Sequence, residues 1–185
     1  MNSVITNELK LLNVRVTHKK TPIHVLEKFT FKDIAKAHRG FLTSGDIREC
    51  VILQTCNRVE LFLALERIDI EKIFDTWKSI TGLEDLSFEF AEIDEDKGAI
   101  HHLLRLTSGL ESLVVGEDQI LGQVKRAFEY SRQNCYVDTF IPIIFEHAIK
   151  VGSRIRTNTG LNKGSVSIGS MAVNLAEEYF DNFQN

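Results

Sequence analysis

The order of hydrophobic patterns along this 185-residue chain predicts an α+β fold, with a ferredoxin-like β-α-β-β-α-β antiparallel sheet followed by a helical C-terminal half. Three observations predict it. Two short segments have strand-like apolar patterns, one long segment is rich in β-forming residues throughout, and the other segments carry apolar residues at helical spacing. Four strands in this order usually form one sheet with helices packed on one face.

The first strand is expected over Leu9–Thr17, where apolar and polar residues alternate. Pro22 is placed to begin a helix, and helical spacing of apolar residues then runs over Ile23–Arg39. The β-rich stretch Glu49–Leu65 is about three times the usual strand length of ~5–6 residues. We therefore expect two strands with the polar tetrapeptide Thr55-Cys56-Asn57-Arg58 at the tip between them.

A second helix is expected over Asp69–Thr81, since Asp69 is a typical N-cap and Gly82 a typical terminator. Phe88, Phe90 and Ile93 indicate a fourth strand. After it the spacing is helical throughout, which predicts four helices at about residues 95–108, 117–133, 140–157 and 165–183.

Composition narrows the class of protein. No apolar run reaches the ~18 residues of a membrane span, and residues 1–10 lack the pattern of a secretory signal, so we expect a cytoplasmic protein without membrane contact. Three cysteines without a CxxC pair, and no HExxH, give no support for a metal site. The net charge is −4, yet residues 120–165 hold seven basic and three acidic residues, either a solvated helix surface or a face for a polyanion.

The segment VILQTCNRVE places Cys56 in a polar setting, two residues before Arg58. A guanidinium near a thiol favours the nucleophilic thiolate, and the same group can clamp a carboxylate through two hydrogen bonds. The alternative is an ordinary small buried cysteine. From these residues alone both interpretations of Cys56 remain open.

A second polar group follows in HLLRLTSGLESLVVGEDQILGQ. His102 lies at the edge of an apolar helical stripe, and a lone helical histidine is more often structural than catalytic. Gln119 and Gln123 are four residues apart and so share one side of a helix that begins near Glu117. Two amides beside a carboxylate suit a small polar ligand, and a solvated helix end is the alternative.

Four blocks together resemble the signature blocks of glutamyl-tRNA reductases, in the family's order and spacing: VTHKKTPI, TCNRVE, HLLRLTSGLESLVVGEDQILGQVK and RIRTNTGLNKGSVSIGSMAVNLA. The resemblance implies that a cysteine thiolate displaces tRNA from glutamyl-tRNA and forms a glutamyl thioester. NADPH then reduces the thioester to glutamate-1-semialdehyde, the precursor of 5-aminolevulinate and tetrapyrroles. It also implies tRNA(Glu) as a partner, a homodimer, and cooperation with the downstream aminomutase.

Residue by residue, the resemblance implies that Cys56 is the nucleophile and that His102 assists it. The implied glutamate-binding residues are Thr55, Asn57, Arg58, Ser112, Glu117, Asp118, Gln119 and Gln123. On charge alone, Arg58 suits a substrate carboxylate and Glu117 the α-ammonium. The chain departs from the family at Leu26, where an arginine is common, and in having Gly-Glu-Asp-Gln in place of Gly-Glu-Pro-Gln.

The chain has no GxGxxG for a dinucleotide. We therefore expect residues 1–157 to form the catalytic, glutamate-recognising domain and residues 158–185 to be a helical segment leading to an absent NADPH-binding domain. Such a chain should deacylate glutamyl-tRNA without reducing it. Two alternatives remain open: a non-catalytic tRNA-binding or regulatory module of the same fold, and a thiol-dependent esterase of unrelated lineage.

Overall fold

The computed structural model describes residues 8–113 and 119–159, which form a four-stranded antiparallel sheet flanked by helices. The strands are β1 (Lys10–Thr17), β2 (Ile47–Gln54), β3 (Arg58–Leu65) and β4 (Glu92–Glu95), in the spatial order β2-β3-β1-β4. All three neighbouring pairs are antiparallel. The predicted α+β class and the ferredoxin-like order of elements are confirmed.

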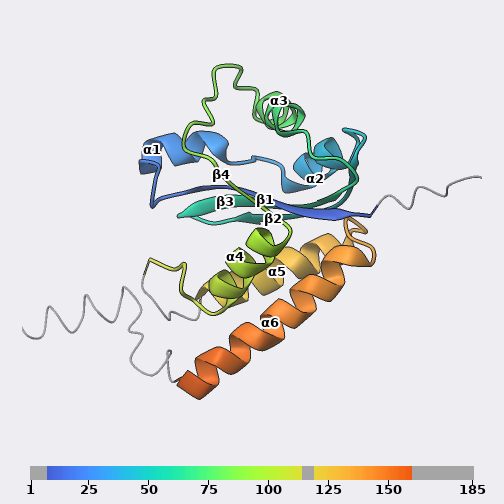
Figure 1. The fold of residues 1–185 in the computed structure, drawn as a ribbon. Coiled ribbons are helices and arrows are strands. Elements are labelled where there is room, and N and C mark those ends of the chain that lie inside the picture. Colours follow the sequence, from blue (N-terminus) through green and yellow to red (C-terminus); the bar gives the residue numbers. More distant parts are fainter. Residues whose placement is uncertain (1–7, 114–118, 160–185) are drawn as a thin grey trace, which may run out of the picture.

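One face of the sheet is covered by α1 (Ile23–Leu26), the 3-10 turn η1 (Glu27–Phe29), α2 (Ile34–Leu42) and α3 (Ile70–Thr81), drawn above the sheet in Figure 1. Trp77 of α3 lies fully buried at the centre of this core and donates from its indole nitrogen to the Phe29 carbonyl (3.0 Å). α3 begins and ends as predicted: Asp69 accepts from the Lys72 amide, and Gly82 adopts φ +72°.

The prediction of one helix over Ile23–Arg39 is wrong, because the chain leaves the helical path after Phe29 and re-enters it at Ile34. A contact from another strand fixes the break. The side-chain amide of Gln54 in β2 accepts from the Phe31 amide (2.8 Å) and donates to the Phe31 carbonyl (3.2 Å). Asp33 then caps α2 by accepting from the Lys36 amide.

The opposite face of the sheet is covered by α4 (Lys97–Thr107), α5 (Gln119–Gln133) and α6 (Phe140–Thr159), below the sheet in Figure 1. The helical C-terminal half therefore supplies a second layer instead of a separate bundle. All eight residues of β3 are buried as a result. Among the described residues, no helix combines the length and apolarity needed to cross a membrane.

The fourth strand begins later than predicted. β4 spans Glu92–Glu95, whereas Phe88 precedes it and stacks on Phe74 with ring centroids 3.9 Å apart. The helix expected from residue 95 accordingly starts at Lys97. The predicted helix at residues 165–183 and the predicted start at Glu117 lie outside the described residues.

The face of the sheet under α4, α5 and α6 is apolar at one end and polar at the other, and the site lies at the polar end. Because side chains alternate along a strand, Arg58, Glu60, Phe62 and Ala64 of β3 share one face. Phe62 and Ala64 join the apolar core with α5 and α6, whereas Arg58 and Glu60 form a buried polar end. Asn13, Arg15 and Thr17 extend that polar end on β1, since Arg15 is the register partner of Glu60 and Thr17 of Arg58.

Glu49 of β2 anchors the beginning of α6 to the sheet. Its carboxylate accepts three backbone N–H groups, from Thr139 (3.0 Å), Phe140 (2.8 Å) and Ile141 (2.7 Å), at the end of the helix where the dipole favours negative charge. The side chain is buried, 2% exposed. The carboxylate therefore fixes α6, which in turn packs on α4 beside the site.

We expect Glu49→Gln to lower the free energy of unfolding by about 1–3 kcal/mol, because one amide oxygen cannot replace two carboxylate oxygens and the new NH2 group faces backbone N–H donors. Urea unfolding followed by circular dichroism measures the change. Glu84→Gln removes the same charge from an exposed side chain and serves as the control. Equal stabilities of the two variants would contradict this role for Glu49.

Candidate active site

Cys56 lies at the tip of the hairpin between β2 and β3, as the sequence predicts, and its thiol is exposed. The turn is held by Thr55, whose amide donates to the Arg58 carbonyl (2.9 Å) and whose hydroxyl accepts from the Asn57 amide (3.1 Å). From the turn after β1, His18 donates its backbone N–H (2.9 Å) and its ring Nδ1–H (3.2 Å) to the Asn57 carbonyl. The nucleophile candidate thus sits on a fixed turn.

Arg58, Glu60 and His102 form a buried charged cluster directly behind this turn. Arg58 donates from Nη1 to Glu60 Oε1 (2.8 Å), and His102 of α4 contacts Glu60 Oε2 through Nε2 (2.7 Å). Asn13 of β1 donates to the same Oε2 (3.3 Å). Glu60 is fully buried, and Arg58 and His102 are 2% and 6% exposed. Two strands and one helix therefore meet at one carboxylate.

The electrostatics of the cluster fix the protonation state of Glu60. Burial acts to raise the pKa of Glu60, but the charges and hydrogen bonds of His102 and Arg58 outweigh burial and lower the pKa to about 2. An ionised carboxylate only accepts hydrogen bonds, so the contacting Nε2 of His102 carries a proton. In the neutral imidazole, Nδ1 is then the basic nitrogen.

The loop after α4 closes over Arg58. Gly109, at φ +85°, turns the chain back, and the Glu111 carbonyl accepts from Arg58 Nη2. The Glu111 carboxylate accepts from Lys19 (2.6 Å) and Arg105 (2.7 Å). Partial burial acts to raise the pKa of Glu111, but these hydrogen bonds outweigh it and hold the pKa below its usual range. Glu111 thus ties the loop to three separate segments.

Ser112, a predicted glutamate-binding residue, follows Glu111 in the same loop. It is 6% exposed, and its hydroxyl has no hydrogen-bond partner among the described residues. A buried hydroxyl without a partner is uncommon, because desolvating it costs about 1–3 kcal/mol. The structure thus leaves this buried hydroxyl unmatched within the described part of the chain.

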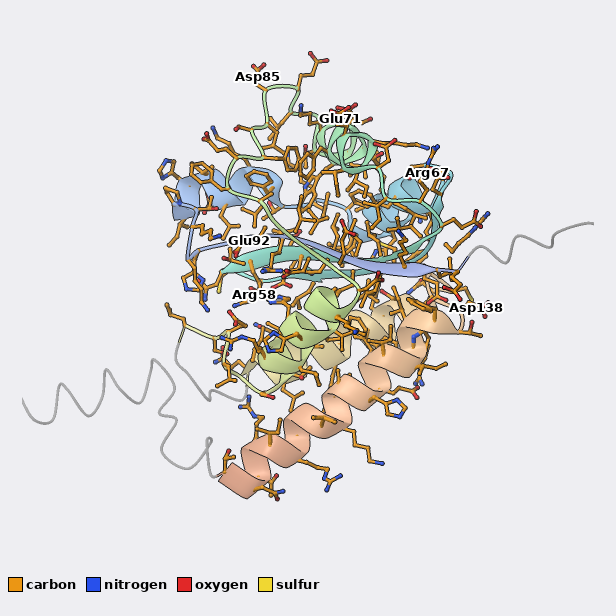
Figure 2. All side chains as sticks on the ribbon, in the orientation of Figure 1. Arg58, Arg67, Glu71, Asp85, Glu92 and Asp138 are labelled. Atoms are coloured by element: carbon orange, nitrogen blue, oxygen red, sulfur yellow. The ribbon has the colours of Figure 1, made fainter. Side chains whose placement is uncertain are left out.

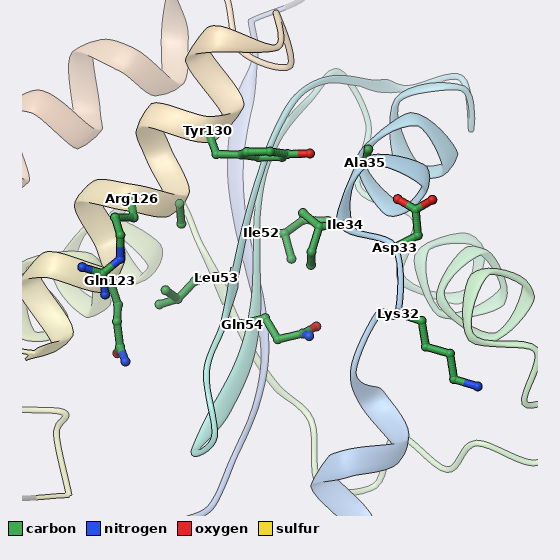
Figure 3. Close-up of a pocket in the computed structure, with 11 residues that line it drawn as sticks. Lys32, Asp33, Ile34, Ala35, Ile52, Leu53, Gln54, Gln123, Arg126 and Tyr130 are labelled. Atoms are coloured by element: carbon green, nitrogen blue, oxygen red, sulfur yellow. The ribbon is translucent and has the colours of Figure 1, made fainter.

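A cavity of about 420 Å³ lies beside the cluster, and both Arg58 and His102 line it. Arg58 comes from the end of the sheet where Figure 2 also shows Glu92. Gln123, by contrast, lines a different groove of about 810 Å³ between α2 and α5. Figure 3 shows that groove, with Gln123, Arg126 and Tyr130 on one side and Ile34 on the other. Gln119 is exposed at the start of α5, and Glu117 and Asp118 lie outside the described residues.

The three cysteines have different environments. Cys50 is buried in the core under α2 and α3, where burial raises the pKa of its thiol and suppresses the thiolate. Cys135 is exposed in the turn after α5. Cys56 alone among them is exposed in the turn between β2 and β3, two residues before Arg58. Within the described ranges, no group of metal-ligating side chains is found.

Sequence reasoning missed Glu60, Asn13 and Glu111. A signal for Glu60 was present, because an acidic residue two positions after Arg58 in the apolar strand RVELFLAL needs a buried partner. Asn13 gave a weaker form of the same signal in β1. Nothing in the sequence marked Glu111, since its contacts with Lys19 and Arg58 join positions 92 and 53 residues apart.

Comparisons with known proteins show which family the chain belongs to. The family model described as "Glutamyl-tRNAGlu reductase, N-terminal domain" matches residues 14–159. A glutamyl-tRNA reductase of Cenarchaeum symbiosum is 46% identical over 177 residues, which cover 95% of this chain and 42% of the relative. One from Methanosarcina barkeri is 42% identical over 166 residues, covering 90% of this chain and 36% of the relative.

A solved structure of glutamyl-tRNA reductase from Methanopyrus kandleri superposes with a TM-score of 0.75 at 38% identity, covering 91% of this chain and 39% of that one. The chain thus spans less than half the length of these relatives. The match to the family model and the identities over nearly the whole chain lead to one conclusion: this chain belongs to the glutamyl-tRNA reductase family, in the part that forms its N-terminal domain.

Proposed function

We propose that this domain carries out the acyl-transfer half of glutamyl-tRNA reduction, with Cys56 as the nucleophile. The observation that carries the proposal is the exposed Cys56 thiol on a fixed turn directly before the Arg58–Glu60–His102 cluster. The sulfur bonds to the glutamyl carbonyl carbon, and the carbon–oxygen bond to the terminal ribose of the tRNA breaks. The thiol proton is transferred overall to the ribose oxygen, so the products are a glutamyl thioester and free tRNA.

Within this proposal, Arg58 binds a carboxylate of the glutamyl group. A guanidinium has five N–H donors, and the contacts to Glu60 and Glu111 use two of them, one on each Nη. The remaining donors suit a two-point grip on a carboxylate. Ser112 contributes its unpartnered hydroxyl to glutamate binding. Thr55 and Asn57 contribute polar groups from the tip of the hairpin. The further glutamate-binding residues of the proposal are Glu117, Asp118, Gln119 and Gln123, with Glu117 for the α-ammonium.

His102 is proposed to move the proton. Glu60 holds Nε2–H, so the ring orientation is fixed and Nδ1 is left to exchange a proton with the thiol or the leaving oxygen. Glu60 acts through His102 and Arg58 and is a positioning residue. The contacts with His102 and Arg58 keep Glu60 ionised, as its lowered pKa indicates.

NADPH is the hydride donor that family membership implies. The described residues do not fit a dinucleotide, because their strand pairings are all antiparallel and the chain has no GxGxxG. We therefore derive no reductive step from them, and propose that the thioester is reduced to glutamate-1-semialdehyde by a part of the protein beyond them. The proposal includes a cytoplasmic homodimer that supplies the semialdehyde to an aminomutase.

We expect Cys56→Ser to abolish acyl transfer with the fold intact, because a serine hydroxyl is far less acidic than a thiol of pKa ~8.5. Mass spectrometry after incubation with glutamyl-tRNA should find a glutamyl adduct on Cys56 in the wild-type domain and none in the variant. Cys135→Ser, at another exposed cysteine, is the control and should retain the adduct. Equal deacylation by wild type and Cys56→Ser would remove Cys56 from the mechanism.

Arg58→Lys should slow acyl transfer roughly tenfold to a hundredfold, since a lost hydrogen bond to a charged group costs about 1.5–3 kcal/mol and lysine lacks the planar fork. Single-turnover deacylation of glutamyl-tRNA measures the change. Arg48→Lys alters an exposed ion pair with Glu66 and is the matched control. A rate near that of wild type would show that Arg58 supplies only diffuse charge.

Glu60→Gln should lower the free energy of unfolding at neutral pH by about 3–5 kcal/mol, because the Arg58 charge is left buried without its counter-ion. The folded-state pKa of Glu60, about 2, lies below its ordinary 4.5. Wild-type stability from this group is therefore complete above pH 4.5 and is lost as the pH falls toward 2.

Urea unfolding at a series of pH values measures both effects. The acid-side loss of stability should be smaller in Glu60→Gln than in wild type, and acyl transfer should also fall because His102 loses its anchor. Glu84→Gln, an exposed change of the same charge, should leave the wild-type pH profile in place. Identical pH profiles for Glu60→Gln and wild type would refute the ionised buried carboxylate.

A further inference from the structure

The block VTHKKTPI has no role in the proposed chemistry, yet the structure puts three of its residues on the wall of the 420 Å³ cavity: Thr17, Lys19 and Lys20. We propose that this cavity binds a backbone phosphate near the 3′ end of the tRNA. The inference rests on the proposed function, because glutamyl-tRNA carries its glutamyl ester on the 3′-terminal ribose. It names the residues that hold the RNA while Cys56 attacks.

The charge of the cavity suits a phosphate. Its described lining holds five Lys or Arg side chains and three carboxylates, so it carries two net positive charges with histidines neutral, although the whole chain is at −4. The five cations are Arg15, Lys19, Lys20, Arg58 and Arg105. They come from β1, the turn after it, β3 and α4, which converge around one space.

Two of the three carboxylates of the lining are each shared between two cations, and the third, Asp94, pairs with Arg15 (2.5 Å). Glu111 pairs with both Lys19 and Arg105 (2.6 and 2.7 Å), and Glu92 pairs with both Lys20 and Arg15 (3.1 and 3.5 Å). The side chains of Lys19, Lys20 and Arg105 are 44%, 59% and 44% exposed. Their ammonium and guanidinium groups can therefore reach a phosphate in the cavity while they keep their carboxylate partners, Glu111 (14% exposed) and Glu92 (23% exposed).

Thr17 supplies an independent observation. It is 3% exposed, and its Oγ1 is buried without a hydrogen-bond partner among the described residues. It lines the cavity and is the register partner of Arg58. A hydroxyl in this position is a donor for an oxyanion, and a ligand oxygen would remove the cost of leaving it unmatched.

The cavity adjoins the reacting centre. Arg58 and His102 line it, Cys56 precedes Arg58 by two residues, and His18, next to Lys19, donates its backbone N–H to the Asn57 carbonyl (2.9 Å). An ester carbonyl held at Cys56 therefore leaves the ribose and its phosphate close to Lys19 and Lys20. The basic residues of α5 and α6 do not line this cavity, and Arg156 among them is buried.

The test measures the dissociation constant of the domain for uncharged tRNA(Glu) over a range of salt concentrations by fluorescence anisotropy. The variant is Lys19→Gln/Lys20→Gln, and the control is Lys28→Gln/Lys36→Gln, which removes two charges from exposed lysines on the opposite face of the sheet. The cavity variant should bind more weakly and lose about one unit of slope in log K against log salt per phosphate contact. The control should retain the wild-type slope.

Thr17→Val gives a second measurement that does not depend on charge. It removes the unpartnered hydroxyl at constant shape, so the folded domain should be as stable as wild type while tRNA binding weakens severalfold with an unchanged slope.

Equal affinities and slopes for the cavity variant and the control would overturn the proposal. The glutamyl adduct on wild-type Cys56 is recorded in parallel. An adduct with unaltered tRNA binding in the cavity variant would reject the phosphate site and leave the acyl-transfer function standing. Absence of the adduct, with the expected loss of tRNA binding, would reject acyl transfer and leave the phosphate site standing.

Discussion

The arrangement of the site depends on the buried carboxylate of Glu60. A single ionised carboxylate in this position would cost several kcal/mol in desolvation. Arg58, His102 and Asn13 offset that cost by surrounding both oxygens. These contacts also satisfy Arg58 and His102, which are themselves buried. The hydrogen bonds of Glu60 therefore hold β1, β3 and α4 in a fixed arrangement. The positions of the Arg58 guanidinium and the His102 imidazole are therefore both fixed by the same carboxylate.

The two-sided burial of the sheet provides the surroundings for this cluster. Helices on one face alone would leave Arg58 and Glu60 in water, where their pairing would be weak. α4, α5 and α6 cover that face, and the Glu49 carboxylate fixes α6 at its first turn. The apolar end of the face, around Phe62 and Phe145, holds the layers together, and the polar end beside it is free to bind. The apolar core and the polar site thus lie side by side on one face of the sheet.

Glu111 couples the two parts of the site. Its carbonyl holds Arg58, which faces the glutamyl group in the proposed function, and its carboxylate holds Lys19 and Arg105 at the rim of the cavity. In the proposed complex, a phosphate that drew Lys19 or Arg105 away from Glu111 would change the loop that carries Ser112. Recognition of the nucleic acid and of the amino acid would then be linked through a few hydrogen bonds, without a large change of shape.

Features set by neighbouring residues were determined by the sequence. The Asp69 cap, the Gly82 terminator and the polar break at Thr55–Asn57 all depend on contacts within a few positions, and the pattern of elements gave the α+β class. The signature blocks indicated the family, which the comparisons confirmed. Only the tertiary structure decided that the helix expected over Ile23–Arg39 breaks, because Gln54 holds Phe31 across 23 residues. Only the tertiary structure also showed that Glu60 contacts His102, 42 residues away, and that Lys19 contacts Glu111, 92 residues away. Such contacts depend on how the layers pack, and they produce no periodic pattern in the sequence.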